Sequence, residues 1–160
     1  IYWYKKAADL GNPDAMFLIG YNYARGWGPS EHIDYEEARI WFRKADAAGI
    51  DNAEEMFNIA IVHRTNRNYE AALKWYQKLV DKGEAYSIRA ILDIAEMYRD
   101  GKLTGGKPDM INAIAWYTKG ADMGDDESAN CLYSIYYNGE GVKKDIGKAV
   151  HIREKYENRK

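Results

Sequence analysis

The side chains best suited to catalysis are few and far apart in this sequence. The histidines are His32, His63 and His151, and none has a second His or a Cys at the spacing of a metal site. His63 precedes Arg64, and we interpret it as a surface residue. Cys131 lies in an apolar stretch, which favours a buried, inert thiol over a nucleophile. We therefore predict no catalytic residue, no metal and no cofactor.

Acidic and glycine-rich segments could also bind ligands. The run from Asp125 to Glu127 begins a predicted helix, where carboxylates are favoured by the helix dipole, so we prefer this reading to a metal site. Gly26-Trp27-Gly28 and Gly139-Glu140-Gly141 lack the following Gly and Lys of phosphate-binding loops and follow no predicted strand. Both glycine pairs are better explained as turns between helices.

Composition narrows the class of partner. The 160 residues are 46% hydrophobic and 30% charged, which is the balance of a folded domain. The 23 basic and 25 acidic residues leave a net charge of −2, so we predict no nucleic-acid partner. Apolar runs such as Ile59 to Val62 are too short to cross a bilayer, and we predict no membrane insertion. The single cysteine fits the cytosol, and leaves a periplasm or endoplasmic reticulum lumen open.

The elements that would position these residues come from an internal repeat. A four-residue step of Trp, Tyr or Phe, any residue and Lys begins at Trp3, Trp41, Trp75 and Trp116. A Gly follows each Trp by eight residues, an Ala precedes the last three by three residues, and Asp or Asn precedes each Ala by four. Asp145 and Ala149 repeat the last pair once more. The Gly positions are Gly11, Gly49, Gly83 and Gly124, and the others are Asp34, Asn68, Asp109, Ala38, Ala72 and Ala113.

Each repeated residue has a role in a helix. Asp and Asn cap the start, and Asp34 with Glu37 fits a capping box. Gly ends the helix in the left-handed conformation, Ala allows close approach, and Trp is expected to fill the space between repeats. Second helices are predicted over 34–48, 68–82, 109–123 and 145–157, and first helices over 13–25, 52–64, 86–100 and 126–138. The Gly-free link 64–67 sets the second pair apart.

These patterns resemble a known family. Ile19, Gly20 and Tyr23 match the first helix of tetratricopeptide repeats, and the segment from Tyr136 to Asp145 is very similar to the consensus of the Sel-one-like repeat subclass. The resemblance implies an all-α fold, an α-α superhelix that forms a right-handed solenoid of four antiparallel helix pairs after a leading half repeat. Residues 1–160 are then one domain, with repeats at about 12–49, 50–83, 84–124 and 125–160, and 1–11 ends a preceding repeat.

The same resemblance implies a non-catalytic adaptor or scaffold, of a kind found in bacteria and in the eukaryotic endoplasmic reticulum. A protein or peptide would bind the concave face, which the family's register assigns to exposed positions on the first helices. Carried onto this sequence, these positions are Phe17, Tyr21, Arg25, Glu55, Ile59, His63, Arg89, Leu92, Glu96, Arg99, Asn130, Ser134, Tyr137 and Asn138. A spacer or assembly element is the alternative. A cell-wall or β-lactam hydrolase is a weaker one, because its Cys pairs and Ser-x-x-Lys motif are missing.

The two ends of the array differ. The last predicted helix is mostly charged and has Ile152 at the Trp position, which indicates a C-terminal cap. Tyr2-Trp3-Tyr4 instead forms an apolar cluster, and we predict self-association through it. Trp27 stands outside the repeated Trp position, so the sequence leaves open whether it is exposed or packs into its turn.

Overall fold

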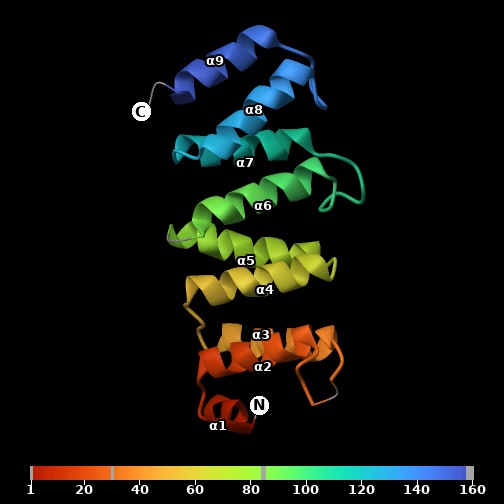
Figure 1. Cartoon of the computed structure of the whole chain (residues 1–160), viewed down its shortest axis with the longest axis vertical. Helices are drawn as coiled ribbons and strands as arrows, with labels where there is room; N and C mark the ends of the chain where they lie inside the picture. Colours follow the sequence, from red (N-terminus) through yellow and green to blue (C-terminus); the bar gives the residue numbers. More distant parts are fainter. Residues whose placement is uncertain (1, 30, 84–85, 158–160) are drawn as a thin grey trace. The chain divides into compact units, whose positions relative to one another are not determined.

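The computed structural model describes residues 2–29, 31–83 and 86–157. This part of the chain forms nine helices and no strand (Figure 1). Every predicted helix is present, and its ends agree with the prediction to within one residue, so the predicted all-α class is confirmed. The helices are α1 (Tyr2–Asp9), α2 (Pro13–Arg25), α3 (Tyr35–Ala47), α4 (Ala53–Thr65), α5 (Tyr69–Lys82), α6 (Ser87–Arg99), α7 (Met110–Asp122), α8 (Asp126–Asn138) and α9 (Ile146–Glu157).

The predicted caps start the second helix of each pair. In every pair the side-chain oxygen of Asp or Asn accepts the backbone N–H three residues later, which satisfies a donor that the helix leaves free. The pairs are Asp34 with Glu37 at 3.0 Å, Asn68 with Ala71 at 3.2 Å, Asp109 with Asn112 at 3.0 Å, and Asp145 with Lys148 at 2.8 Å.

The capping box at Asp34 is only half formed. The Glu37 carboxylate does not return to the Asp34 N–H as the box requires; its Oε1 accepts the Trp41 indole N–H at 2.9 Å. The Asp34 N–H donates instead to the Tyr23 carbonyl at 2.9 Å. The prediction was therefore wrong for this half of the box, because the Glu37 carboxylate bonds to Trp41 and the Asp34 N–H bonds to Tyr23 instead.

The bond from the cap to the preceding helix recurs in all four pairs. The N–H of the cap residue donates to a carbonyl in the last turn or turns of the first helix, which fixes where the second helix begins. The remaining bonds are Asn68 to His63 at 2.9 Å, Asp109 to Tyr98 at 2.9 Å and Asp145 to Tyr136 at 2.8 Å. The Gly-free second pair makes the same closure because Arg67 takes the left-handed conformation, with φ of 61°.

The core is filled by the residue after each repeated Trp. Phe42, Tyr76 and Tyr117 are fully buried, whereas Trp41 and Trp116 are only half-buried. Trp75 is buried, and Trp41 and Trp116 pack as half-buried side chains against the clusters around Ile19 and Tyr117, so the repeated Trp borders the core while the next residue fills it. The repeated Ala residues, namely Ala38, Ala72, Ala113 and Ala149, are fully buried as predicted.

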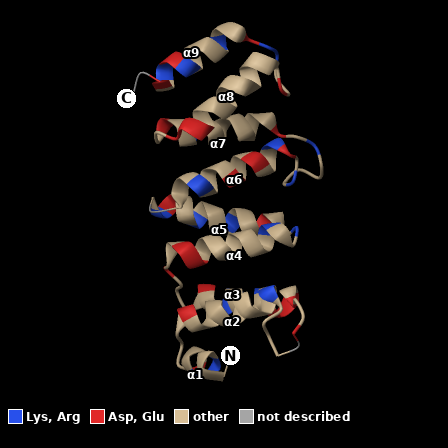
Figure 2. Cartoon of the chain, viewed as in Figure 1, with Lys and Arg blue, Asp and Glu red and all other residues tan. Residues whose placement is uncertain are grey.

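Two compact units divide the chain, Ile1–Trp75 and Tyr76–Lys160, with the boundary inside α5. In the first unit, Ala8, Ala15 and Ile19 join α1 to α2. In the second, Tyr117, Leu132 and Ile135 centre a cluster that α6, α7, α8 and α9 share. Lys, Arg, Asp and Glu are scattered along the helices of both units (Figure 2). The single-domain organisation with the repeat limits given above stays a prediction.

Candidate protein-binding surface

Four of the predicted binding residues lie in the core rather than on an exposed face. The buried residues are Phe17, Ile59, His63 and Leu92. Each occupies a position where its first helix contacts neighbouring helices; Phe17, for example, stacks on Phe42 of α3 with ring centroids 6.2 Å apart. The expectation that these four positions are exposed was wrong, and they line no open surface of the chain.

His63 is the clearest correction among them. It is only 3% exposed, and its Nδ1 lies 2.7 Å from the Tyr35 hydroxyl, within hydrogen-bond distance. The ring also meets Phe42 edge-on at 5.9 Å. Burial lowers the pKa of His63 to about 4, and the positive charge of Arg39 adds to this effect. His63 is therefore a neutral core residue at pH 7, not the surface residue expected from its neighbour Arg64.

The exposed part of α2 carries a cluster of aromatic and cationic side chains. Arg25 lies over the ring of Tyr21 at 5.0 Å and 5.8 Å from the ring of Trp27, and its Nη2 donates to the Tyr21 hydroxyl at 2.5 Å. Trp27 is 65% exposed, which answers the open question about its environment. The Trp27 N–H donates to the Asn22 carbonyl at 2.8 Å, so the turn holds the indole at the end of the helix. We call Tyr21, Arg25 and Trp27 the α2 cluster.

Trp27 was absent from the predicted binding set, although its neighbours gave a signal. Gly26 has φ of 72° and accepts no side chain easily, since an added Cβ would lie 3.2 Å from the Ile33 nitrogen. An added Cβ at Gly28 would lie 2.9 Å from the Tyr23 ring. The constrained turn between these two glycines holds Trp27 outward. The Gly-Trp-Gly sequence could therefore have identified Trp27 as a candidate binding residue.

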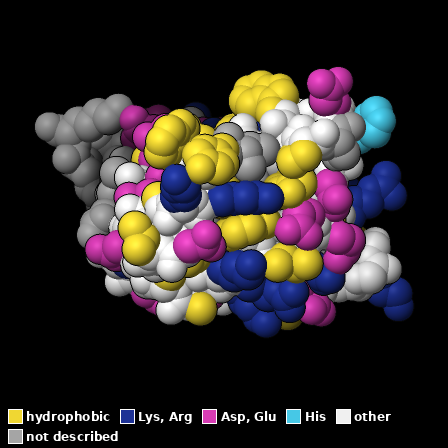
Figure 3. Space-filling model, turned by 90° about the horizontal axis from the view of Figure 1, so that it is seen from below, with side chains coloured by type: hydrophobic (Ala, Val, Ile, Leu, Met, Phe, Trp, Pro, Cys, Tyr) yellow, Lys and Arg dark blue, Asp and Glu magenta, His cyan; other side chains and the backbone are white. Residues whose placement is uncertain are grey.

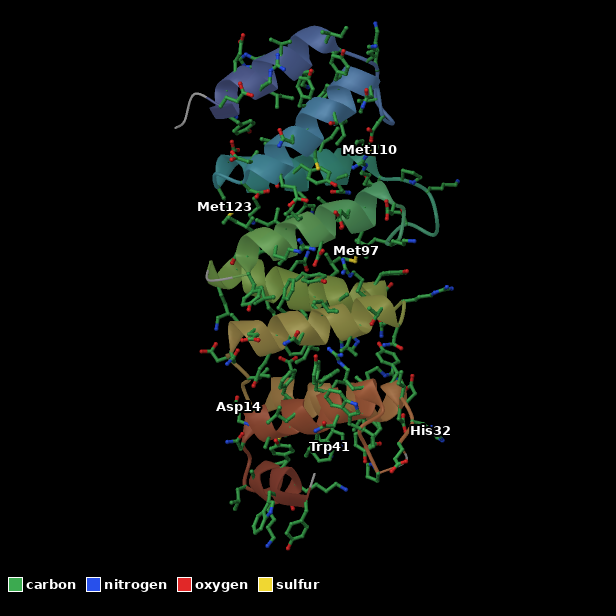
Figure 4. The ribbon with its side chains drawn as sticks, viewed as in Figure 1. Asp14, His32, Trp41, Met97, Met110 and Met123 are labelled. Atoms are coloured by element: carbon green, nitrogen blue, oxygen red, sulfur yellow. The ribbon has the colours of Figure 1, made fainter. Side chains whose placement is uncertain are left out.

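Glu55 of α4 is half-buried beside Asp14 of α2, which Figure 4 labels at the N-terminal end of its helix. Burial raises the pKa of Glu55 to about 7, and the charge and hydrogen bond of Asp14 contribute further, followed by Glu54. Near neutral pH the Glu55 carboxyl is therefore protonated part of the time. Both residues belong to the first unit and lie on first helices, and only Glu55 was among the predicted binding residues.

In the second unit, the end of α8 faces the end of α6. The Arg99 guanidinium forms an ion pair with the carboxylate of Glu140 in the turn after α8. Tyr137 is exposed and stacks on Tyr133 with centroids 5.3 Å apart. Asn138 is exposed next to it. We call Arg99, Tyr137, Asn138 and Glu140 the α8 cluster.

The remaining predicted positions are spread along the same two helices. Arg89 and Glu96 are exposed on α6, and the Arg89 Nε lies 3.9 Å from the buried Asp93 carboxylate. Ser134 is half-buried on α8. Asn130 is exposed and borders a hollow of about 320 Å³ between α8 and α9, where Arg153 lies over the Tyr133 ring at 5.1 Å. These residues accompany the α8 cluster but form no comparable group.

Cys131 lies below this surface against Tyr117. It is half-buried, and burial raises the pKa of its thiol. Burial also raises the pKa of Tyr117 to about 12, and the neighbouring Cys131 acts in the same direction. Both groups are therefore protonated at pH 7, the state in which a thiol or phenol is a poor nucleophile.

The free face of α1 presents another group of aromatic side chains (Figure 3). Trp3 is 74% exposed, and Tyr2 and Tyr4 are exposed beside it. The Lys6 Nζ lies 4.8 Å from the Tyr2 ring and 5.2 Å from the Trp3 ring. Seen from this end, hydrophobic and basic side chains lie side by side, which is the composition of a contact surface rather than of a solvated helix face.

Two further properties bear on the kind of site. Among residues 2–29, 31–83 and 86–157, no group of three or more His, Cys, Asp or Glu side chains is placed to hold a metal ion. Within the same residues, no helix combines the length and apolarity that a membrane span requires.

Comparison with known proteins identifies the repeat. A protein-family model described as Sel1 repeat matches residues 1–12, 13–49, 63–84, 88–125 and 128–152. Over 111 residues, the chain is 27% identical to Cytochrome c oxidase assembly factor 7 of Xenopus tropicalis, and the alignment covers 66% of this chain and 48% of that protein. Cytochrome c oxidase assembly factor 7A of Xenopus laevis is 26% identical over the same length. The chain thus spans about half the length of these curated relatives.

Solved structures show the same architecture. A Sel1 repeat protein from Oxalobacter formigenes is similar with a TM-score of 0.54 and 28% identity, over 89% of this chain and 56% of that one. A protective antigen of uropathogenic Escherichia coli strains, which displays an SLR fold, gives a TM-score of 0.58 with 24% identity, over 99% of this chain and 36% of that one. The predicted helix-pair fold is confirmed by both likenesses.

Proposed function

Since this chain belongs to the Sel1 repeat family, we propose that it is a non-catalytic scaffold that binds a protein or peptide through the exposed side chains of its first helices. The fold itself suggests a role in protein–protein interaction or assembly, because stacked helix pairs present long surfaces with many side chains. The relatives that are named assembly factors favour the holding of a partner over a purely spacing role.

The observation that carries the proposal is the α2 cluster. Trp, Tyr and Arg are the residue types that most often dominate binding energy at protein interfaces. Here one of each meets at the C-terminal end of α2, where Tyr21 is half-buried and Arg25 is exposed. Trp27 contributes little to the core because it is 65% exposed. A large exposed indole fixed by a turn loses little conformational freedom on binding, so it is suited to act as an anchor.

The α8 cluster supports the same role in the second unit. Its members combine an exposed aromatic ring at Tyr137, an amide at Asn138 and the Arg99–Glu140 ion pair. Such a mixture suits a protein surface with both apolar and polar groups. His63 is packed in the core, and the neighbouring Tyr117 and Cys131 both have raised pKa values that keep them protonated at pH 7, which supports a role without catalysis.

The test is a capture experiment, followed by measurement of the affinity between the purified chain and each captured protein. The native chain is immobilised, proteins retained from the lysate of its source organism are identified by mass spectrometry, and each is produced and titrated by calorimetry. We expect Tyr21→Ala/Trp27→Ala to raise the Kd of a genuine partner by about tenfold or more. The control is Ile111→Ala/Met123→Ala, which removes exposed apolar side chains of the second unit that belong to neither cluster.

The outcomes separate the alternatives. A partner that binds both double variants as it binds the native chain would exclude the α2 cluster as the binding surface. If no retained protein binds in the purified system, the chain acts as a spacer and the scaffold proposal fails. Circular dichroism of each variant shows that a lost interaction is not a lost fold.

A further inference from the structure

The turn between α8 and α9 surrounds an open hollow of about 690 Å³. Three lysines line it, Lys143, Lys144 and Lys148, together with Tyr136, Val142, Asp145 and Ile146. None of these residues belongs to the α2 or α8 cluster or to the predicted concave face. In Figure 2, blue marks basic residues on the connection that leads into α9. We call this feature the lysine hollow.

Two of the three lysines of the hollow contact aromatic rings. Lys148 holds its Nζ 4.2 Å from the centre of the Tyr136 ring, and Lys144 holds its Nζ 5.5 Å from that of Tyr137. Within the described residues, neither these lysines nor Lys143 forms an ion pair with a carboxylate. An ammonium group held over a ring face keeps its full charge available to an anion.

The acidic groups of the same turn are already engaged. The Asp145 Oδ1 accepts the Lys148 backbone N–H at 2.8 Å and caps α9. The Glu140 carboxylate pairs with Arg99, which lies on α6. Asp145 keeps its negative charge, but three lysines outnumber it in the lining, so the lysine hollow is locally positive in a chain whose net charge is −2.

Apolar side chains make up the rest of the lining. Ile146 is 51% exposed at the first turn of α9, and Val142 packs its inner side against the core of the second unit. The Tyr136 ring forms part of the same surface. Exposed apolar groups among unneutralised ammonium groups favour a ligand that carries both negative charge and an apolar side chain.

We propose that the lysine hollow binds a segment of a partner protein in which two or more Asp or Glu residues flank an apolar side chain. The carboxylates pair with the ammonium groups of Lys143, Lys144 and Lys148, and the apolar side chain contacts Ile146 and Val142. This inference goes beyond the scaffold proposal, because it adds a surface besides the α2 and α8 clusters and states the chemistry of the segment that fits it. It does not require the α2 cluster to bind anything.

The test uses a fluorescein-labelled peptide in which Phe and Leu alternate with Asp and Glu, and an otherwise identical peptide with Asn and Gln in place of the acids. Anisotropy is measured with the whole native chain at low and at physiological ionic strength. We expect saturable binding of the acidic peptide, a Kd that rises with salt, and at least about tenfold weaker binding of the amide peptide.

Variants locate the site. Lys143→Glu/Lys148→Glu should weaken binding of the acidic peptide by about tenfold or more, while the control Lys102→Glu/Lys107→Glu, which makes the same charge change in the turn between α6 and α7, should change it less than about twofold. Lys143→Gln/Lys148→Gln, which removes the charges without reversing them, should also weaken binding of the acidic peptide. It serves as the test variant if charge reversal disturbs the turn. Tyr21→Ala/Trp27→Ala should leave this peptide unaffected, which keeps the test separate from that of the scaffold proposal.

Three results would overturn the inference. Equal weakening in the two charge-reversal variants would mean that binding follows net charge alone. Absence of saturable binding by the acidic peptide would remove the site. Tighter binding of poly-uridylate RNA than of the acidic peptide, lost in the Lys143→Glu/Lys148→Glu variant, would assign the lysine hollow to a nucleic acid instead of a protein.

Discussion

The Tyr35 hydroxyl and the Nδ1 atom of His63 lie 2.7 Å apart, and this contact joins the start of α3 to the end of α4. The His63 ring is enclosed further by Phe42, whose centroid is 5.9 Å away. Arg39 contributes positive charge nearby. A proton added to His63 would therefore place a second positive charge in a buried site, at a cost that the unfolded chain does not have.

His63 should make the protein less stable in mild acid. Its pKa is about 4 in the folded state, whereas the ordinary value, which applies to the unfolded state, is 6.5. Between pH 4 and pH 6.5 the unfolded state therefore binds the proton more strongly than the folded state. The stability from the neutral ring is complete above about pH 6.5 and is lost as the pH falls toward 4. Urea unfolding measures this effect. Between pH 8 and pH 5, the free energy of unfolding of the native chain should fall by about 2 kcal/mol more than that of the His63→Gln variant.

The comparison with His63→Gln cancels the titration of all other groups, since both chains contain them. Glutamine retains a polar atom for the Tyr35 hydroxyl, so the variant should still fold. Identical losses of unfolding free energy in the two chains would show that His63 does not titrate against the fold.

Glu55 should act in the opposite direction. Its folded pKa of about 7 exceeds the ordinary value of 4.5, so the folded state holds the proton more tightly. The stability linked to the protonated carboxyl is complete below pH 4.5 and is lost as the pH rises through 7. Glu55→Gln, which cannot ionise, should be about 1–2 kcal/mol more stable than the native chain at pH 8. The two should differ little at pH 4, and a gain that is the same at both pH values would contradict this mechanism.

The helices could be predicted from the sequence because their signals are local. Asp34, Asn68, Asp109 and Asp145 each mark a helix start by a bond to the backbone three residues later, and such a bond needs no knowledge of the rest of the fold. The same holds for Gly49, whose left-handed conformation ends a helix.

Burial on the first helices could not be predicted in the same way. Tyr21 and Phe17 are four residues apart on one face of α2, yet Phe17 is enclosed by Phe42 while Tyr21 is half-buried. The difference depends on where α3 crosses α2, which the repeat spacing does not give. His63 was misread for the same reason, because its partner Tyr35 lies 28 residues earlier in the chain.

Close packing of α2 on α3 makes Gly20 intolerant of a side chain. An added Cβ would lie 2.8 Å from the Phe42 ring and 3.0 Å from the Ala38 carbonyl oxygen. Gly20→Ala should therefore lower the free energy of unfolding by about 1–3 kcal/mol, even though Ala is the better helix former. Denaturant unfolding followed by circular dichroism measures the change.

Gly147 in α9 is the matched control for Gly20. It also lies within a helix, but an added Cβ would have only the Asp145 Oδ1 at 3.5 Å, which is an ordinary contact. Gly147→Ala should stabilise the protein by about 0.5–1 kcal/mol through helix propensity. A similar stabilisation by Gly20→Ala would mean that α2 and α3 separate easily enough to accept a methyl group.

The exposed aromatic face of α1 should support association between copies of the chain. Tyr2, Trp3 and Tyr4 expose apolar surface of the kind that water disfavours, and Trp3 is the most exposed of them. Sedimentation velocity of the native chain should show an average mass that rises with concentration. Trp3→Glu should abolish this rise by placing a carboxylate in the contact, whereas Trp27→Glu, which alters an indole of similar exposure in the turn after α2, should leave it unchanged. A native chain that sediments as a monomer at every concentration, with Trp3→Glu indistinguishable from it, would exclude this face as a self-association surface.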